Sequence, residues 1–181
     1  MAFRKICASA TAVLLPTLSS ISPAHAASDN MIENIMQSRG IDSQTHVDVT
    51  SSLQQLDEDA GDANFVAGYL EGMNEAFPLA EQHAKEVGVS RGDGCTWSPD
   101  RWGKANFRPA CDRHDKCYGH TSTVSRLQCD NNFHSDLRKI CSAAYSKSKV
   151  KKSACNGVAA AYYTGVRKFG RSHYQGKGSP R

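Results

Sequence analysis

A histidine and an aspartate are adjacent in the run CDRHDKCY, which extends from Cys111 to Tyr118 and contains two cysteines. If this run is helical, His114 and Asp115 fall on the same side of the helix as both ends of the run. A second carboxylate, Asp130, lies on the next predicted helix. An imidazole oriented by a carboxylate is the usual arrangement for activating a nucleophile. The pattern therefore predicts a His114–Asp130 pair formed where two helices meet.

The segment from Gly92 to Gly170 resembles the secreted phospholipase A2 superfamily, most closely its bacterial and fungal branch. Four stretches carry the resemblance, in the same order along the chain: GDGCTWSPDRWGKANFRPAC, CDRHDKCY, CDNNFHSDLRKIC and SACNGVAAAYYTGVRKFG. The resemblance implies an enzyme, a phospholipase A2 with its catalytic domain at residues 92–170, that releases the sn-2 fatty acid of glycerophospholipids by calcium-dependent hydrolysis. The alternative is a catalytically silent membrane- or receptor-binding protein on the same scaffold.

By position in these stretches, the resemblance implies that His114 is the catalytic base and that Asp130 orients it. Tyr118 matches the tyrosine whose hydroxyl supports the aspartate in this superfamily. A neutral His114 can accept a proton from a water molecule, and Asp130 can fix its tautomer and stabilise the imidazolium. No serine nucleophile is required in this reaction.

The resemblance also implies a Ca²⁺ site formed by the side chains of Asp93 and Asp115 and the backbone carbonyl of Gly94. These ligands offer only hard oxygen donors, which favours calcium over zinc or copper. A cation there would hold the substrate phosphate and polarise the scissile carbonyl. Asp93-Gly94-Cys95 is similar to the shorter bacterial arrangement rather than to the glycine-rich loop of animal enzymes.

Residues 1–26 have the pattern of a secretory signal peptide. Arg4 and Lys5 precede an apolar stretch, and Ala24-His25-Ala26 is a small-x-small cleavage site. The apolar stretch is shorter than a membrane span, which needs about 18–20 residues. We therefore expect a secreted, extracellular protein without a transmembrane segment, and we expect it to be a monomer.

Six cysteines remain after the signal peptide, and an even number in an exported chain favours disulfides. A zinc cluster is the competing interpretation, but the chain has no CxxC pair. The resemblance implies three bonds, each of which would stabilise the fold by roughly 2–4 kcal/mol. These bonds join Cys95 with Cys111, Cys117 with Cys129, and Cys141 with Cys155.

Charge is divided unevenly along the chain. Residues 27–100 contain 3 Lys and Arg against 14 Asp and Glu, whereas residues 101–181 contain 17 against 4. The basic half is suited to an anionic phospholipid membrane or micelle surface, and also to nucleic acid phosphates. A nucleic-acid groove would interleave aromatic residues, and the lysine cluster at 147–152 has only Tyr145 nearby. We therefore expect a phospholipid surface as partner and no nucleic acid.

The acidic region 27–91 is expected to be helical, either as part of the fold or as a pro-segment. Asn30 with Glu33 indicates a capped helix start, and Gly40 a stop. From Asp62, apolar residues recur at intervals of four, until Pro78 is expected to interrupt the helix and Gly88 to end its continuation. The recurring residues are Phe65, Tyr69, Met73 and Phe77.

Glycine and proline predict an irregular loop over residues 92–108, which would bind calcium. Helices are expected from Pro109 to Tyr118, from just after Ser122 or Thr123, and from the lysine-rich turn to Gly170. The polar tail, residues 171–181, is expected to be disordered. The predicted fold is all-α: a small disulfide-stapled helical bundle with two antiparallel catalytic helices and an irregular calcium-binding loop.

Overall fold

The structure is a computed structural model that describes residues 23–54, 62–83, 94–96 and 98–181. These residues form six α-helices, with a 3-10 helix (Gly170–His173) after the last of them. A two-stranded antiparallel hairpin, β1 (Arg101–Trp102) and β2 (Ala105–Asn106), precedes the fourth helix. The helices are α1 (Pro23–Ser38), α2 (Ser43–Gln54), α3 (Ala63–His83), α4 (Arg108–Tyr118), α5 (Arg126–Ala144) and α6 (Lys149–Phe169). The expectation of a disulfide-stapled all-α fold is confirmed.

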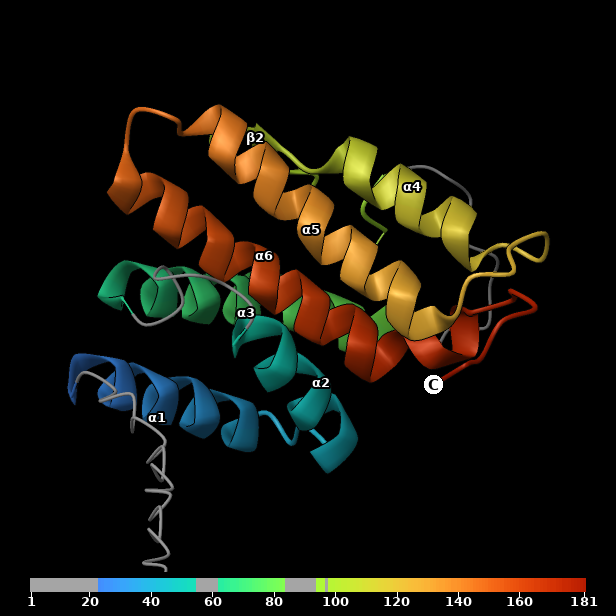
Figure 1. Cartoon of the computed structure of the whole chain (residues 1–181), viewed down its shortest axis with the longest axis horizontal. Helices are drawn as coiled ribbons and strands as arrows, with labels where there is room; N and C mark the ends of the chain where they lie inside the picture. The colour runs from blue at the N-terminus through green and yellow to red at the C-terminus, as the bar shows by residue number, and fades with distance from the viewer. Residues whose placement is uncertain (1–22, 55–61, 84–93, 97) are drawn as a thin grey trace, which may run out of the picture.

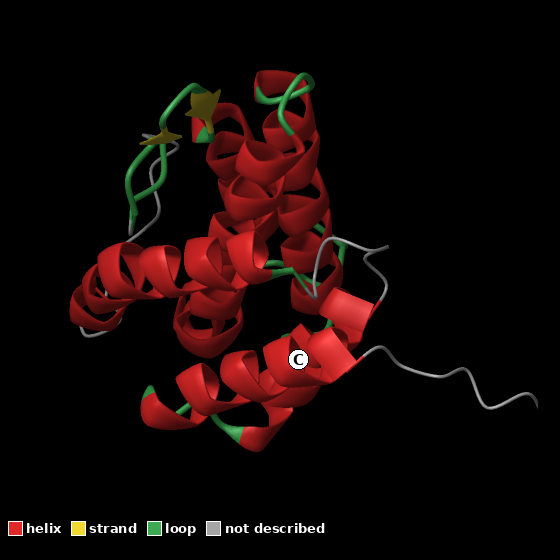
Figure 2. Ribbon diagram, turned by 90° about the vertical axis from the view of Figure 1, so that its left-hand side faces the viewer, coloured by secondary structure: helices red, strands yellow, loops and turns green. Residues whose placement is uncertain are grey.

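Helix α6 lies at the centre of the bundle, between α3 and α5 (Figure 1). Helix α4 packs against α5 and runs antiparallel to it, while α2 contacts α6 and α1 contacts α3. The hairpin lies at one end of the bundle when the molecule is viewed from the side (Figure 2). No helix in the described part of the chain combines the length and the hydropathy needed to span a membrane.

Two apolar clusters hold these layers together, and α6 contributes to both. One cluster joins α1, α2 and α3 to α6 through residues such as Met36, Val49 and Tyr163. The other joins α4, α5 and β2 to α6 through residues such as Phe107 and Leu137. The first three helices therefore bury apolar side chains against the same helix that supports α5.

Glycine allows α3 and α6 to approach each other closely. A Cβ atom on Gly157 would lie 2.1 Å from the carbonyl oxygen of Phe65, and one on Gly68 would lie 1.9 Å from that of Ala154. Both distances are well below a van der Waals contact, so neither position accepts a side chain without displacing a helix backbone. The two glycines thus fix the separation of α3 and α6.

Three disulfides crosslink the C-terminal half in the pairs that the resemblance implies. Cys117–Cys129 joins the end of α4 to the start of α5, and Cys141–Cys155 joins α5 to α6. Cys95–Cys111 ties the loop before the hairpin to the first turn of α4. The three bonds therefore join α4 to α5, α4 to the loop before the hairpin, and α5 to α6.

Helix α3 continues through Pro78 to His83, so the expected interruption at this proline is wrong. Proline removes one backbone donor from the helix, which normally costs about 3 kcal/mol. Here Phe77 and Ala80 are buried on both sides of the proline, and their packing against the bundle keeps the helix continuous. Gly88, the expected end of the continuation, lies outside the described residues.

Several other boundaries differ from the expectations. Helix α1 begins before Asn30, although Gly40 does end this region with a φ of 60°. The sequence pattern did not predict α2 as a separate helix. Its sequence is mainly polar, and only Thr45, Val49 and Leu53 are buried. Helix α5 begins at Arg126, where the Ser125 hydroxyl accepts a hydrogen bond from the backbone N–H of Gln128.

The loop before α4 contains the short hairpin, which the sequence did not predict. Gly103 supplies the turn with a φ of 53°, and β1 pairs with β2 through Trp102 and Ala105. Strands of two residues are too short to show an alternating pattern. The Tyr145 hydroxyl fixes the hairpin to α5: it accepts from the Lys104 N–H and donates to the Trp102 carbonyl.

The tail from Arg171 is ordered, so the expectation of disorder is wrong. Backbone hydrogen bonds join Gln175 to the Tyr118 carbonyl and Lys177 to the Ser122 carbonyl. The Tyr174 ring packs edge-on against Tyr118, with ring centroids 5.4 Å apart. Polar composition concealed these contacts, because most of them are made by the backbone.

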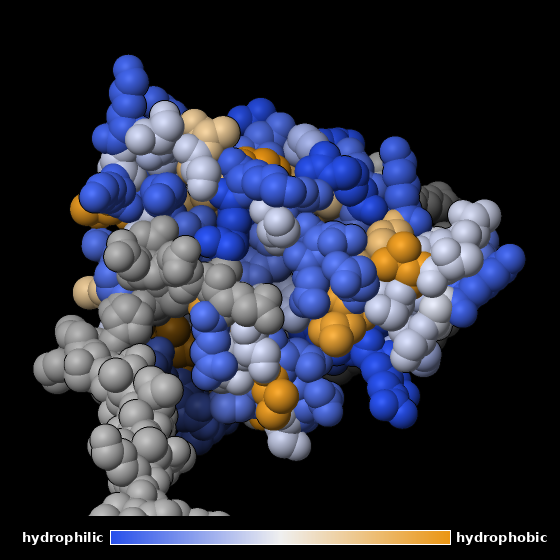
Figure 3. All heavy atoms as spheres, viewed as in Figure 1, coloured by the Kyte–Doolittle hydropathy of each residue, from blue (hydrophilic) through white to orange (hydrophobic). Residues whose placement is uncertain are grey.

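Apolar side chains on the described surface are scattered. The face in Figure 3 is mainly hydrophilic, with single apolar side chains separated by polar ones. Isolated exposed apolar residues are normal for a protein surface. The large exposed ones are Met31, Val47, Leu70, Leu79, Val124 and Val150. This face therefore offers no broad apolar patch.

Candidate active site

His114 and Asp130 meet between α4 and α5. The His114 Nε2 atom lies 2.7 Å from the Asp130 Oδ1 atom, and the two side chains are 8% and 0% exposed. The pair is close to the Cys117–Cys129 disulfide, which joins the same two helices. The sequence thus correctly indicated that these two residues lie in contact.

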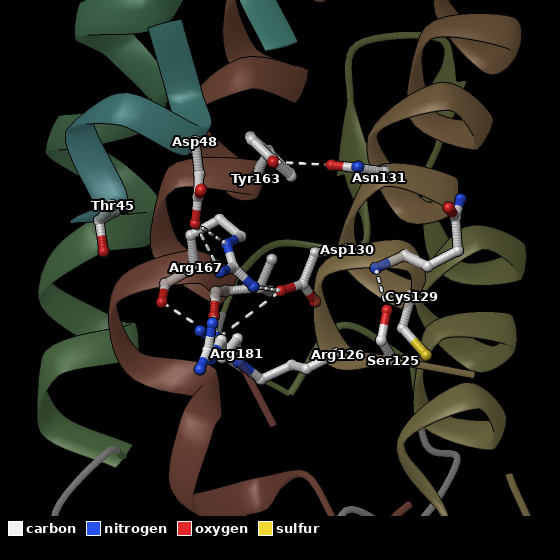
Figure 4. Close-up of polar contacts among 12 residues, drawn as sticks. Thr45, Asp48, Ser125, Arg126, Cys129, Asp130, Asn131, Tyr163, Arg167 and Arg181 are labelled. Atoms are coloured by element: carbon white, nitrogen blue, oxygen red, sulfur yellow. Dashed lines mark hydrogen bonds and ion pairs between the residues drawn. The ribbon is translucent and has the colours of Figure 1, made fainter. Parts of the chain in front are cut away.

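Three further side chains lie around the Asp130 carboxylate, and Figure 4 labels two of them, Arg126 and Arg167. The Tyr118 hydroxyl donates to Oδ1 at 2.7 Å, so this oxygen accepts from both Tyr118 and His114. The Arg167 Nη1 atom donates to Oδ2 at 2.6 Å. Arg126 lies farther away, with its Nη1 atom 3.6 Å from Oδ2. Every neighbour of the carboxylate is therefore a donor or a cation.

Asp130 remains ionised although it is fully buried. Burial alone would raise the pKa of this carboxyl, but hydrogen bonds and charge from His114, with further hydrogen bonds from Arg167 and Tyr118, bring it below its usual value. The same contact raises the pKa of Tyr118, because burial and the negative charge of Asp130 both disfavour a phenolate. Tyr118 therefore stays a neutral donor.

The ionised carboxylate also fixes the histidine tautomer. Asp130 can only accept hydrogen bonds, so neutral His114 must carry its proton on Nε2. The Nδ1 atom then holds the lone pair that can accept a proton. Ring contacts with Tyr118 and Phe133, whose centroids lie 4.2 Å and 4.7 Å from that of His114, hold the imidazole in this orientation.

His114 opens onto a small cavity between the helices and the loop that precedes the hairpin, with a volume of about 50 Å³. Such a volume is large enough for a water molecule. Phe133 from α5 and Val166 from α6 contribute apolar surface to the cavity. The remaining lining residues are Gly94, Cys95, Thr96, Ser98, Cys111, Asp115, Tyr118 and His173.

Two of the three predicted calcium ligands, Gly94 and Asp115, line this cavity together with His114. The third, Asp93, lies outside the described residues. Gly94 has a φ of 103°, and a Cβ atom there would lie 2.5 Å from the Asp100 Oδ1 atom, so the position requires glycine. The Asp100 carboxylate also accepts from the Cys95 N–H at 2.8 Å, which fixes the turn beside Gly94.

The donors present fit a calcium ion, because a backbone carbonyl and a carboxylate are both hard oxygen ligands. Within the described ranges, no group of three or more His, Cys, Asp or Glu side chains forms a metal site. A calcium site here would therefore combine backbone oxygen, Asp115 and ligands from the neighbouring loop or from water.

Arg167 and Asp48 belong to this site, but the sequence analysis did not identify them. Arg167 bridges Asp130 and Asp48, donating to the Asp48 Oδ2 atom from Nη2 at 2.6 Å and from Nε at 3.0 Å (Figure 4). The spacing of Arg167 was informative: it follows Tyr163 by one helical turn and therefore lies on the same buried face of α6. A cation on a buried face requires a carboxylate partner.

Two further histidines of α5 and of the segment after α4, His134 and His120, differ in their surroundings. His120 is exposed, whereas His134 is buried and lies outside the cavity around His114. His134 stacks on Tyr163, with ring centroids 4.9 Å apart, and its Nδ1 atom forms a 2.9 Å hydrogen bond with Ser52. It therefore joins α5 to α2 and α6 rather than contributing to the site.

Burial, and secondarily the charge of Arg138, lowers the pKa of His134 from 6.5 to about 3. Between these pH values the unfolded chain takes up a proton that the folded chain does not, so stability falls as pH decreases from about 6.5. We expect this group to cost about 3 kcal/mol of unfolding free energy on going from pH 7 to pH 4.

Urea denaturation of wild type and a His134→Leu variant at both pH values measures this effect. The variant should lose about 3 kcal/mol less stability than wild type on acidification. An exposed His120→Leu control should follow wild type. Equal acid losses in wild type and His134→Leu would contradict the assignment.

Comparison with known proteins identifies the family of this chain. Residues 73–170, more than half of the chain, match the family model described as prokaryotic phospholipase A2. The chain belongs to this family. The match confirms the resemblance to the bacterial and fungal branch, and it includes α4, α5 and α6. Asp48 and the whole of α2 lie outside the matched residues.

Curated relatives agree with this assignment. A secretory phospholipase A2 of Beauveria bassiana is 34% identical over 79 residues, which cover 43% of this chain and 42% of the relative. One from Arthroderma benhamiae is 33% identical over 84 residues, 43% of this chain and 57% of the relative. Conodipine-P3 of Conus purpurascens is 37% identical over 72 residues, 39% of this chain and 40% of the relative. The chain thus spans roughly half the length of these relatives, and no solved structure matches it.

Proposed function

We propose that this member of the prokaryotic phospholipase A2 family hydrolyses the sn-2 acyl ester of glycerophospholipids in a calcium-dependent reaction. The observation that carries the proposal is the buried 2.7 Å contact between His114 and Asp130 beside a cavity that Gly94 and Asp115 also line. A histidine that contacts a buried carboxylate, and two residues that could supply hard oxygen donors, thus lie at one cavity, which supports the proposal.

His114 is the general base in this proposal. Its Nδ1 atom accepts a proton from a water molecule in the cavity as that water attacks the ester carbonyl. General-base catalysis of this kind contributes typically about 10²–10⁴-fold. Asp130 keeps the proton on Nε2 and stabilises the imidazolium that forms, and Tyr118 holds the Asp130 oxygen that faces His114.

Asp93, Gly94 and Asp115 are the proposed calcium ligands. When bound there, the ion would supply positive charge for the substrate phosphate and for the oxygen of the scissile carbonyl. Asp115 follows His114 directly on α4, so the same helix positions the base and a metal ligand. Gly94 is held near them by the Cys95–Cys111 disulfide, because Cys111 is also on α4.

The remaining residues support action on a lipid surface outside the cell. The excess of basic residues in 101–181 favours peripheral binding to anionic phospholipids. Three disulfides favour an oxidising compartment, and two of the relatives are called secretory. We therefore propose a secreted monomer that acts at membranes or micelles, with residues 1–26 as its signal peptide.

The position of ester cleavage tests this function. Vesicles of a phosphatidylglycerol with different fatty acids at sn-1 and sn-2 are incubated with the protein and calcium, and the released acids are identified by mass spectrometry. Release of the sn-2 acid together with the matching sn-1 lysophospholipid is expected. Release of the sn-1 acid, or of neither acid, would contradict the proposed function.

A further inference from the structure

A continuous row of buried charges extends from the His114–Asp130 pair into the N-terminal part of the chain. Arg167 is 3% exposed and Asp130 is 0% exposed, so their 2.6 Å contact is shielded from water. The other side of the Arg167 guanidinium contacts Asp48, whose side chain is 10% exposed. The order along the row is Asp48, Arg167, Asp130 and His114, supplied by α2, α6, α5 and α4. Figure 4 shows the first three of these residues.

The row fixes the Asp130 carboxylate as well as neutralising it. His114 and Tyr118 occupy Oδ1, and Arg167 occupies Oδ2, so the carboxylate is held at both oxygens. Charge-assisted hydrogen bonds are shorter and stronger than neutral ones, and the planar guanidinium defines the angle of its partner. A carboxylate held at both oxygens cannot rotate away from His114.

Asp48 contacts the opposite edge of the Arg167 guanidinium. Its Oδ2 atom accepts from both Nε and Nη2, so two donors of that edge are fixed on one carboxylate oxygen. Arg126 does not replace Arg167, because its guanidinium is engaged by the backbone carbonyls of Val166, Arg167 and Pro180. Only Arg167 therefore connects Asp130 to the N-terminal helices among the described residues.

We infer that Arg167 and Asp48 are positioning residues for the His114–Asp130 pair, so that helix α2 completes the catalytic unit. The inference rests on the proposed function. It also distinguishes the two alternatives for the acidic region, since an N-terminal segment that orients the catalytic carboxylate is needed in the active protein. A pro-segment that merely shields the basic half would be dispensable after cleavage.

The test measures kcat and KM for the full-length protein on a short-chain phosphatidylcholine kept below its critical micelle concentration, with calcium. A monomeric substrate removes effects of charge on membrane binding. Arg167→Met should lower kcat by about 100-fold, since small misplacement of a catalytic group has effects of this size, and KM should change little. Arg167→Lys should recover part of the lost kcat, and Asp48→Asn should cause a smaller decrease.

The double variant Asp48→Asn/Arg167→Met separates positioning from stability. Arg167→Met alone leaves Asp48 without its cation, which destabilises a buried site, whereas the double variant removes both charges. Its melting temperature should therefore exceed that of Arg167→Met, while its kcat stays as low. If Arg167→Met does not fold, the double variant and Arg167→Lys provide the comparison.

An exposed ion pair supplies the matched control. Arg113 contacts Asp136 at 2.7 Å with side chains 54% and 22% exposed, so Arg113→Met and Asp136→Asn make the same chemical changes at the surface. Both should retain wild-type kcat. A kcat for Arg167→Met within about twofold of wild type would overturn the inference, as would recovery of kcat together with stability in the double variant.

A second readout separates this inference from the proposed function. Nitrogen-15 NMR reports which ring nitrogen of His114 carries the proton, whether or not the protein hydrolyses lipid. Wild type should have the proton on Nε2, and the double variant should show a mixture of tautomers. An inactive wild type would defeat the proposed function alone, whereas an unchanged tautomer in the double variant would defeat the positioning role.

Discussion

The Asp130→Asn variant is expected to lose sn-2 ester hydrolysis by about four orders of magnitude, the size of effect that follows when a catalytic histidine is held in the wrong tautomer. All the groups around this side chain are donors: His114 and Tyr118 at one oxygen, and Arg167 at the other. An amide has only one acceptor oxygen to offer them. The permanent cation Arg167 takes that oxygen, so the amide NH₂ faces His114.

His114 must then accept at Nε2, and its proton moves to Nδ1, where the attacking water requires a lone pair. The measurement is the initial rate of fatty-acid release from phospholipid vesicles with calcium. Asp136→Asn is the control, because it makes the same change at a partly exposed salt bridge on the same helix. A rate for Asp130→Asn within about tenfold of wild type would contradict this mechanism.

Removal of calcium is expected to produce the second large effect. EDTA should reduce hydrolysis by at least about 10²–10³-fold, the usual consequence of losing a group that stabilises the developing oxyanion, and excess calcium should restore it. Asp115→Asn should show the same loss, since it replaces a proposed carboxylate ligand beside His114. The rates are measured on the same vesicles with and without the chelator.

Calcium binding is measured separately from activity by isothermal titration calorimetry. Wild type should bind one ion per chain, and Asp115→Asn should bind it much more weakly. The Asp136→Asn variant controls for loss of a negative charge on the protein. Full activity in EDTA, or wild-type calcium affinity in Asp115→Asn, would count against the proposed metal site.

The sequence was most informative where local pattern and chemistry coincide. The run from Cys111 to Tyr118 lies within the single helix α4, so helical spacing indicated where His114 lies, whereas the contact of Tyr118 with Asp130 was implied by the resemblance. Asp130 was found because it also follows a cysteine on a helix. The residues that make these contacts are all within a few positions of a disulfide-bonded cysteine.

Contacts between segments far apart in the chain were harder to predict from the sequence. Asp48 and Arg167 are far apart in the chain. Arg167 lies in the last of the four stretches that resemble the superfamily but Asp48 lies in none of them, so only the packing of α2 on α6 brings the two together. Pro78 is a comparable case, because the tertiary packing around it outweighs a local helix-breaking preference. The ordered tail beyond Arg171 depends on backbone hydrogen bonds, which composition does not encode.

The central claim is that His114 is the base of a phospholipase reaction. Its most direct test is the rate of sn-2 fatty-acid release by His114→Gln, relative to wild type, on the same vesicles with saturating calcium. Glutamine retains a polar side chain but cannot accept the proton, so the rate should fall by about 10²–10⁴-fold while calcium binding is retained. A folded, calcium-bound His114→Gln protein that hydrolyses the ester at the wild-type rate would contradict the claim.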